Sequence, residues 1–200
     1  MKIIGIAGGV ASGKSVVSAK LQELGAFVID ADRIGHDVLK QPEVIAAATS
    51  RWGDSVTDDS GQLNRSAIGA RVFGDTERHT ADLRYWESET HPKITHELQR
   101  TLTSLRNSKE YPAAVLDAPV MFKAGWHKEC DVIVFVDATR EVRLQRAQKR
   151  GWTEEQFEDR EACQTPLDEK RQYCEFVIDN SGDLEQTYEQ VLTFWNSLSL

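Results

Sequence analysis

The chain has 200 residues, 40% of them hydrophobic and 28% charged, which is enough for one generous globular domain with a real core. A formal net charge of −8 argues against a nucleic-acid binder, and no apolar segment reaches the length of a membrane span. Three scattered cysteines argue against a disulfide framework or a paired-cysteine zinc site, and they favour reduced thiols in the cytoplasm.

The first segments alternate between strand and helix. Residues 2–7 (KIIGIA) form a continuous apolar run, which is typical of a strand buried on both faces of a parallel sheet. Residues 16–24 carry apolar side chains at helical spacing, and Gly25 is placed to end that helix. Residues 26–30 (AFVID) predict a second strand, which we expect to lie beside the first. Pro42 is suited to the first position of a further helix.

The later segments continue this alternation. Residues 65–107 look helical, with an interruption expected at His91 because a proline follows it. Further strands are predicted at 113–119, 131–137 and 176–180, and further helices at 140–150, 153–164 and 183–198. The pattern predicts an α/β fold with a central, mostly parallel sheet flanked by helices.

Two excursions interrupt this single expected domain. The helical stretch before residue 113 is longer than a simple crossover needs, so we interpret about 41–109 as an inserted helical lobe. The charged helices of about 139–172 form a smaller excursion, which we interpret as a lid. The core would then comprise residues 1–40, 110–138 and 174–200.

The segment GGVASGKS follows the first strand directly and fits the pattern GxxxxGK[ST]. In such a loop the backbone N–H groups surround phosphate oxygens, Lys14 reaches the terminal phosphates, and Ser15 supplies a hydroxyl for Mg²⁺. The strand before it and the helix after it are the context that this motif requires. The residues expected to contact the nucleotide phosphates are Gly9, Ala11, Ser12, Gly13, Lys14, Ser15 and Val16.

Several classes of nucleotide-binding protein share such a loop. A guanine-specific switch needs an NKxD motif, which the sequence lacks, and the DxxG match at Asp58 reads better as a turn. The segment ending at Asp117 only partly matches the acidic strand end of motor ATPases. A small phosphotransferase is therefore the favoured class, and a regulatory switch without an acceptor is the rival from another class.

Acidic residues follow the second strand. Asp30 and Asp32 come at its carboxyl end, the edge at which open α/β sheets bind ligands. One of them could cap a helix that begins near Arg33, while the other faces a phosphoryl acceptor. Asp30 and Asp117 are both candidates to support Mg²⁺ through water.

The chain resembles the dephospho-coenzyme A kinase family over nearly its whole length. The resemblance rests on several segments in order, of which the loop is shared most widely: GGVASGKS, LGAFVIDAD, GQLNRSAIGARVF, ETHPKI, DAPVMFKAG, RLQRAQKRG, EACQTPLDEKR and FVIDNSG. It implies a P-loop kinase that uses ATP and Mg²⁺ to phosphorylate the ribose 3′-hydroxyl of dephospho-coenzyme A. The alternative is another small-molecule, nucleoside or nucleotide kinase of the same fold.

The resemblance also implies roles for single residues. Asp32 matches the second aspartate of the family's DAD motif and would be the general base beside the acceptor. Arg146 and Arg150 match lid arginines that contact ATP, although exposed helix faces often carry such residues without function. Asn180 matches a contact to the ATP base. Two positions match the acceptor lobe and would bind dephospho-coenzyme A: Arg65 and His91.

The sequence departs from the family pattern at a few positions. Lys123 stands where the family commonly has glutamate, so no role of that glutamate is carried over. Ala11 replaces a loop glycine, and it still offers a backbone N–H if its conformation permits.

Overall fold

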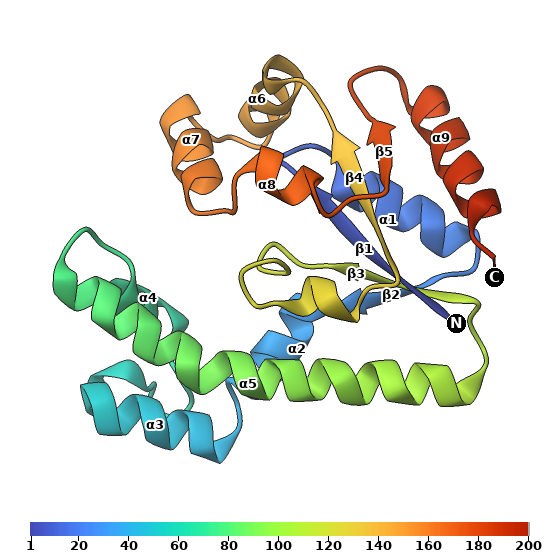
Figure 1. The fold of residues 1–200 in the computed structure, drawn as a ribbon. Coiled ribbons are helices and arrows are strands. Elements are labelled where there is room, and N and C mark those ends of the chain that lie inside the picture. Colours follow the sequence, from blue (N-terminus) through green and yellow to red (C-terminus); the bar gives the residue numbers. More distant parts are fainter. Residues whose placement is uncertain (200) are drawn as a thin grey trace. The chain divides into compact units, whose positions relative to one another are not determined.

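The computed structural model describes residues 1–199 and divides into two compact units. The first comprises Met1–Asp30 and the chain from Leu102 onward, and the second comprises Ala31–Thr101. Figure 1 shows the order of the elements along the chain. The phosphate-loop segment lies wholly in the first unit.

The first unit is built on a five-stranded parallel sheet with the order β2-β3-β1-β4-β5. Its strands are β1 (Lys2–Gly8), β2 (Phe27–Asp30), β3 (Ala113–Asp117), β4 (Val132–Asp137) and β5 (Phe176–Asp179). The central place of β1 explains its unbroken apolar run, because both faces of the strand are covered. The expectation that the second strand lies beside the first is wrong, since β3 is inserted between them.

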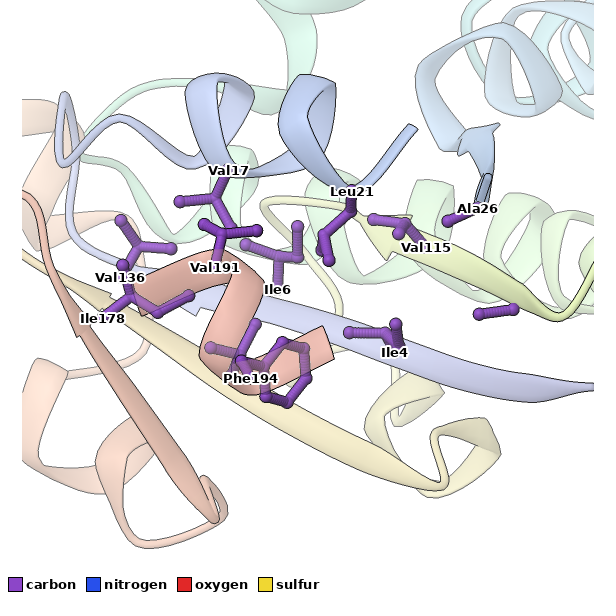
Figure 2. Close-up of a cluster of buried hydrophobic side chains, with 12 residues drawn as sticks. Ile4, Ile6, Val17, Leu21, Ala26, Val115, Val136, Ile178, Val191 and Phe194 are labelled. Atoms are coloured by element: carbon purple, nitrogen blue, oxygen red, sulfur yellow. The ribbon is translucent and has the colours of Figure 1, made fainter. Parts of the chain in front are cut away.

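One face of the sheet is covered by α1 (Lys14–Glu23) and α9 (Leu184–Ser197). Figure 2 shows Val17 and Leu21 of α1 and Val191 and Phe194 of α9 in one cluster with Ile6 and other strand side chains. These four helix side chains are at most 1% exposed. Burial of this kind stabilises a fold by about 1.5–3 kcal/mol per large apolar side chain.

Local signals set the ends of these helices. After α1, Gly25 has φ +106°, its N–H donates to Gln22 O, and the N–H of Ala26 donates to Leu21 O at 3.0 Å. This is a Schellman motif, which glycine favours at its left-handed position. The Asp183 carboxylate caps α9 by accepting from the N–H of Gln186 at 2.9 Å.

The smaller excursion consists of three short helices. They are α6 (Arg140–Lys149), α7 (Glu154–Ala162) and α8 (Leu167–Arg171). Thr153 and Gln156 form a capping box at the start of α7. The sequence did not predict α8, nor the 3₁₀ turn η2 (Trp126–Glu129).

The second unit is helical. Its elements are α2 (Ala31–Val38), α3 (Pro42–Trp52), the 3₁₀ turn η1 (Asp54–Val56), α4 (Arg65–Val72) and α5 (Glu77–Ser108) as far as Thr101. Proline opens α3 as predicted. Trp52 packs edge-on against the ring of Tyr85, with centroids 5.9 Å apart. The buried Asp82 carboxylate accepts from Arg51 of α3 at 2.9 Å and so ties α3 to α5.

The predicted interruption at His91 is wrong, because α5 continues through Pro92. A proline inside a helix costs about 3 kcal/mol through a lost hydrogen bond and a clash. Packing on both sides of Pro92 outweighs that cost, since Asp82 and Leu98 of the same helix are 2% and 1% exposed. Within residues 1–199, no helix combines the length and apolarity needed to cross a membrane.

Candidate active site

The loop between β1 and α1 has a left-handed backbone at several positions. Its φ angles are +152° at Gly8, +57° at Ala11 and +97° at Gly13. A Cβ atom at Gly8 would lie 2.6 Å from the carbonyl oxygen of Val136, so only glycine fits there. Ala11 adopts the left-handed conformation despite its side chain, and backbone strain of this kind is typical of functional loops.

Two side chains from distant parts of the chain hold the loop at Ser12. The Asn180 side-chain amide donates to the Ser12 carbonyl oxygen at 2.7 Å, and the Arg146 guanidinium donates to the same oxygen at 3.0 Å. Arg146 also donates to the carbonyl oxygen of Asn180 at 2.7 Å. The Asn180 amide oxygen accepts from the Thr187 hydroxyl at 2.9 Å, which completes a buried network. Arg146 therefore binds loop backbone in this structure.

Arg143, whose role no sequence pattern indicated, supports the other side of the loop. It is 5% exposed and donates to the carbonyl oxygens of Ala138 at 3.1 Å and Val10 at 3.4 Å. It also forms an ion pair with Glu161 of α7. A Cβ atom at Gly9 would lie 2.7 Å from its Nη1 atom, so the second loop glycine is needed for close approach.

Two lysines face the start of the loop. The Lys14 ammonium lies 3.4 Å from Gly9 O, and the Lys170 ammonium lies 3.4 Å from Gly8 O. Both side chains line one small pocket with Gln164 and Phe122. Burial lowers the pKa of Lys14, and Asp117 opposes this shift. Burial and the charge of Lys14 lower the pKa of Lys170 to about 8. Two lysine ammonium groups at one place favour an anion beside them.

The remaining residues predicted for the nucleotide lie around α1 and α6. Ser15 and Val16 are in the first turn of α1, where the N–H of Val16 donates to Gly13 O at 2.9 Å. Arg150 follows α6 directly, and its positive charge helps to lower the pKa of Lys14.

Carboxylates end the strands on one side of the sheet. Asp30 of β2 and Asp117 of β3 are register partners at the carboxyl ends of their strands. β3 also pairs with β1, the strand that leads into the phosphate loop. Asp117 therefore ends the strand next to β1. In residues 1–199, no group of three or more His, Cys, Asp and Glu side chains is arranged to hold a metal ion.

Three predicted residues belong to the second unit. Asp32 lies in the first turn of α2 with an exposed carboxylate, two residues after β2 ends. Arg65 is the first residue of α4, whose N-cap Asn64 accepts from two backbone N–H groups. His91 is half-buried within α5, and its carbonyl oxygen accepts from the Thr95 hydroxyl at 2.8 Å.

Lys170 is the other residue that sequence reasoning missed. It stands in the charged run LDEKR, which reads as an exposed helix face, yet it is 3% exposed. The available signal was its place in EACQTPLDEKR, one of the segments that carry the family resemblance. Sequence alone did not show that its side chain turns inward.

Comparisons with known proteins agree on one family. The model of the dephospho-CoA kinase family matches residues 2–186. The dephospho-CoA kinase of Aquifex aeolicus is 36% identical over 200 residues, which cover 100% of this chain and 98% of the relative. The crystal structure of TT1252 from Thermus thermophilus has a TM-score of 0.81 and 30% identity, covering 98% of this chain and 96% of that one.

A second solved structure supports the fold. The dephospho-CoA kinase from Campylobacter jejuni has a TM-score of 0.65 and 20% identity, with 98% of this chain and 96% of that chain covered. The predicted α/β kinase fold is confirmed.

Proposed function

The chain belongs to the dephospho-CoA kinase family, and from this premise we propose how its own residues transfer phosphate from ATP to the acceptor. The acceptor is the ribose 3′-hydroxyl of dephospho-coenzyme A. A bond forms between this oxygen and the γ-phosphorus while the bond to the bridging oxygen of ADP breaks. The products are coenzyme A, ADP and the proton of the hydroxyl.

The phosphate loop binds the triphosphate. Backbone N–H groups of the loop surround its oxygens, apart from those of Ser12 and Val16, which donate to Gly9 O and Gly13 O. The positive end of α1 faces the same charge. Lys14 binds the terminal phosphates. The Asn180 and Arg146 contacts to Ser12 keep the loop in its strained shape, so little ordering is needed when ATP binds.

Asp32 is the proposed general base. A ribose hydroxyl is weakly acidic, so the carboxylate orients it and accepts its proton late in the reaction. The exposure of Asp32 supports this role, because its carboxylate is accessible to an acceptor hydroxyl. Arg65 and His91 are proposed to bind the acceptor, in keeping with an acceptor-binding lobe at about 41–109.

Mg²⁺ is the proposed metal, and the donor set fits it. Ser15 and the register pair Asp30 and Asp117 offer oxygen ligands, and Mg²⁺ in kinases takes few protein ligands besides phosphate and water. When bound, the ion neutralises charge on the phosphate oxygens. Asp117 is favoured over Asp30, because its charge already acts on Lys14.

The lid, about 139–172, would supply further cations. Arg146 and Arg150 are proposed to contact ATP once it is bound, in addition to the contacts of Arg146 with the loop backbone. Exclusion of water by the lid would prevent ATP hydrolysis.

The three cysteines are unpaired, which supports a cytoplasmic location.

The loop held by Asn180 and Arg146, with two lysines at its start, is the observation that carries this proposal. A coupled ADP-release assay tests it, comparing ATP alone with ATP plus dephospho-coenzyme A. We expect release only with the acceptor, and none with nucleosides or small alcohols. Equal release with and without dephospho-coenzyme A would contradict the proposed function.

A further inference from the structure

Lys170 is a buried cation whose contacts leave it able to bind a ligand. Its ammonium donates to the Gln164 side-chain oxygen at 2.7 Å and to Gly8 O at 3.4 Å. The second contact is long for a hydrogen bond. Within residues 1–199 these are its hydrogen bonds, so one of the three N–H donors of the ammonium has no acceptor in the protein.

The charges around this ammonium do not neutralise it. Lys14 of α1 and Arg143 of α6 are positive and Glu161 of α7 is negative, while Asp117 of β3 acts on Lys14. Glu161 is already paired with Arg143. Holding a buried ammonium next to another lysine is costly, and a bound anion would offset that cost.

The surroundings of Lys170 point toward the transferring phosphate. The pocket that it lines with Lys14 is also lined by Gly8, where the phosphate loop starts, and by Ala118, just after Asp117. The terminal phosphates are expected at this position, because Lys14 of such a loop reaches the β- and γ-phosphates.

We infer that Lys170 is a second catalytic cation, which binds the γ-phosphoryl oxygens during transfer while Gln164 positions its ammonium. This inference rests on the proposed function. In the transition state, negative charge is spread over the equatorial oxygens of the transferring phosphoryl group. A fixed cation beside these oxygens would therefore stabilise the transition state more than it stabilises bound ATP. Because α8 lies in the lid segment, Lys170 would also couple the lid to catalysis.

A structural role makes a different prediction. If Lys170 only held α8 against the loop, a methionine of similar length would fill the same space without an unpaired charge. The Lys170→Met protein would then fold at least as stably and would keep its turnover rate.

The experiment compares Lys170→Met with wild-type protein and with Lys149→Met, a matched change at an exposed lysine of α6. Turnover with saturating ATP and dephospho-coenzyme A is measured together with ATP affinity by calorimetry. We expect kcat to fall by about 10²-fold or more in Lys170→Met, with less than about a tenfold loss of ATP affinity. Lys149→Met should match the wild type.

A second measurement uses the wild-type protein, in case Lys170→Met fails to fold. A bound phosphate would raise the lowered pKa of Lys170, so ATP binding at pH 8.5 should take up protons. Calorimetry in buffers of different ionisation enthalpy measures this uptake, which should be smaller in Lys170→Met.

Three outcomes are informative. A folded Lys170→Met protein with kcat within about threefold of the wild type would overturn the inference, since a catalytic cation is worth far more. Absence of proton uptake by the wild type would also overturn it. If instead the wild type shows no release of ADP that depends on dephospho-coenzyme A, the proposed function fails, and proton uptake alone then decides whether Lys170 contacts the triphosphate.

Discussion

The side-chain amide of Asn180 donates to the carbonyl oxygen of Ser12 at 2.7 Å, across 168 positions of sequence. This bond joins the segment after the last strand to the phosphate loop after the first. The same amide accepts from Thr187 of α9, so the loop is fixed to the helix that covers the sheet.

Replacing Asn180 with alanine should therefore damage both stability and ATP binding. The change removes two buried hydrogen bonds, and we expect a loss of about 1–3 kcal/mol in the free energy of unfolding. The Michaelis constant for ATP should rise because the loop is no longer held. Chemical denaturation and steady-state kinetics measure the two effects. Asn196→Ala, at an exposed position of the same α9, is the control and should change neither.

Glycine is required at residue 13 for two reasons that can be separated. Its φ is +97°, and a Cβ atom there would collide with the Asn180 amide nitrogen. Gly25 has a similar φ of +106° with open space around it. Gly25→Ala should therefore lower the free energy of unfolding through backbone strain alone, by about 1–2 kcal/mol. Gly13→Ala should lower it further and should also weaken ATP binding. Equal losses of thermal stability in the two proteins would show that the contact with Asn180 is unimportant.

Lys14→Ala should abolish turnover. The variant loses the cation proposed to bind the terminal phosphates, and a loss of about 10²–10³-fold or more in kcat is expected. Folding should be preserved, because removing a buried charge with a lowered pKa relieves a desolvation cost. The measurement is the coupled ADP-release assay beside a thermal unfolding curve. Turnover close to that of the wild type would show that the loop does not hold the reacting phosphate.

The second unit should lose stability in acid through Asp82. Burial alone would raise the pKa of this carboxyl, but the hydrogen bond and charge of Arg51, with Arg78, outweigh it and hold the pKa below its ordinary value. A lowered folded-state pKa means that the stabilisation is complete above the unfolded pKa of about 4 and is lost as pH falls. Asp82→Asn should flatten the dependence of unfolding free energy on pH between about 5 and 2. An unchanged slope would exclude this carboxyl as its source.

Much of the first unit was predictable because its signals are local. An apolar run with no polar alternation indicates a central strand, as β1 proved to be, and Gly25 ended α1 through backbone geometry. The motif residues of the loop could be proposed from the sequence, because glycine, lysine and serine at that spacing each have a direct chemical reason to contact phosphate or Mg²⁺. In the second unit, the turn at Asp58 was predictable for the same reason, since its carboxylate accepts from the nearby N–H groups of Ser60 and Gln62.

The remainder depends on tertiary structure that a single sequence does not encode locally. Parallel strands are joined by crossovers, so chain order leaves open whether β2 or β3 neighbours β1. A proline such as Pro92 favours the end of a helix by its local chemistry, but the packing of α5 overrides this preference. Lys170 and Arg143 read as solvated charges, because only the folded chain shows that their side chains turn toward the loop.

The proposed phosphate transfer depends most on Asp32, which comes two residues after the end of β2. This residue is proposed as the base for the acceptor hydroxyl. The decisive measurement is kcat of Asp32→Asn with dephospho-coenzyme A, with ATP affinity measured on the same protein. We expect kcat to fall by about 10²–10⁴-fold while ATP affinity stays close to that of the wild type. A kcat near the wild-type value in the folded variant would contradict the assignment of Asp32 as the base.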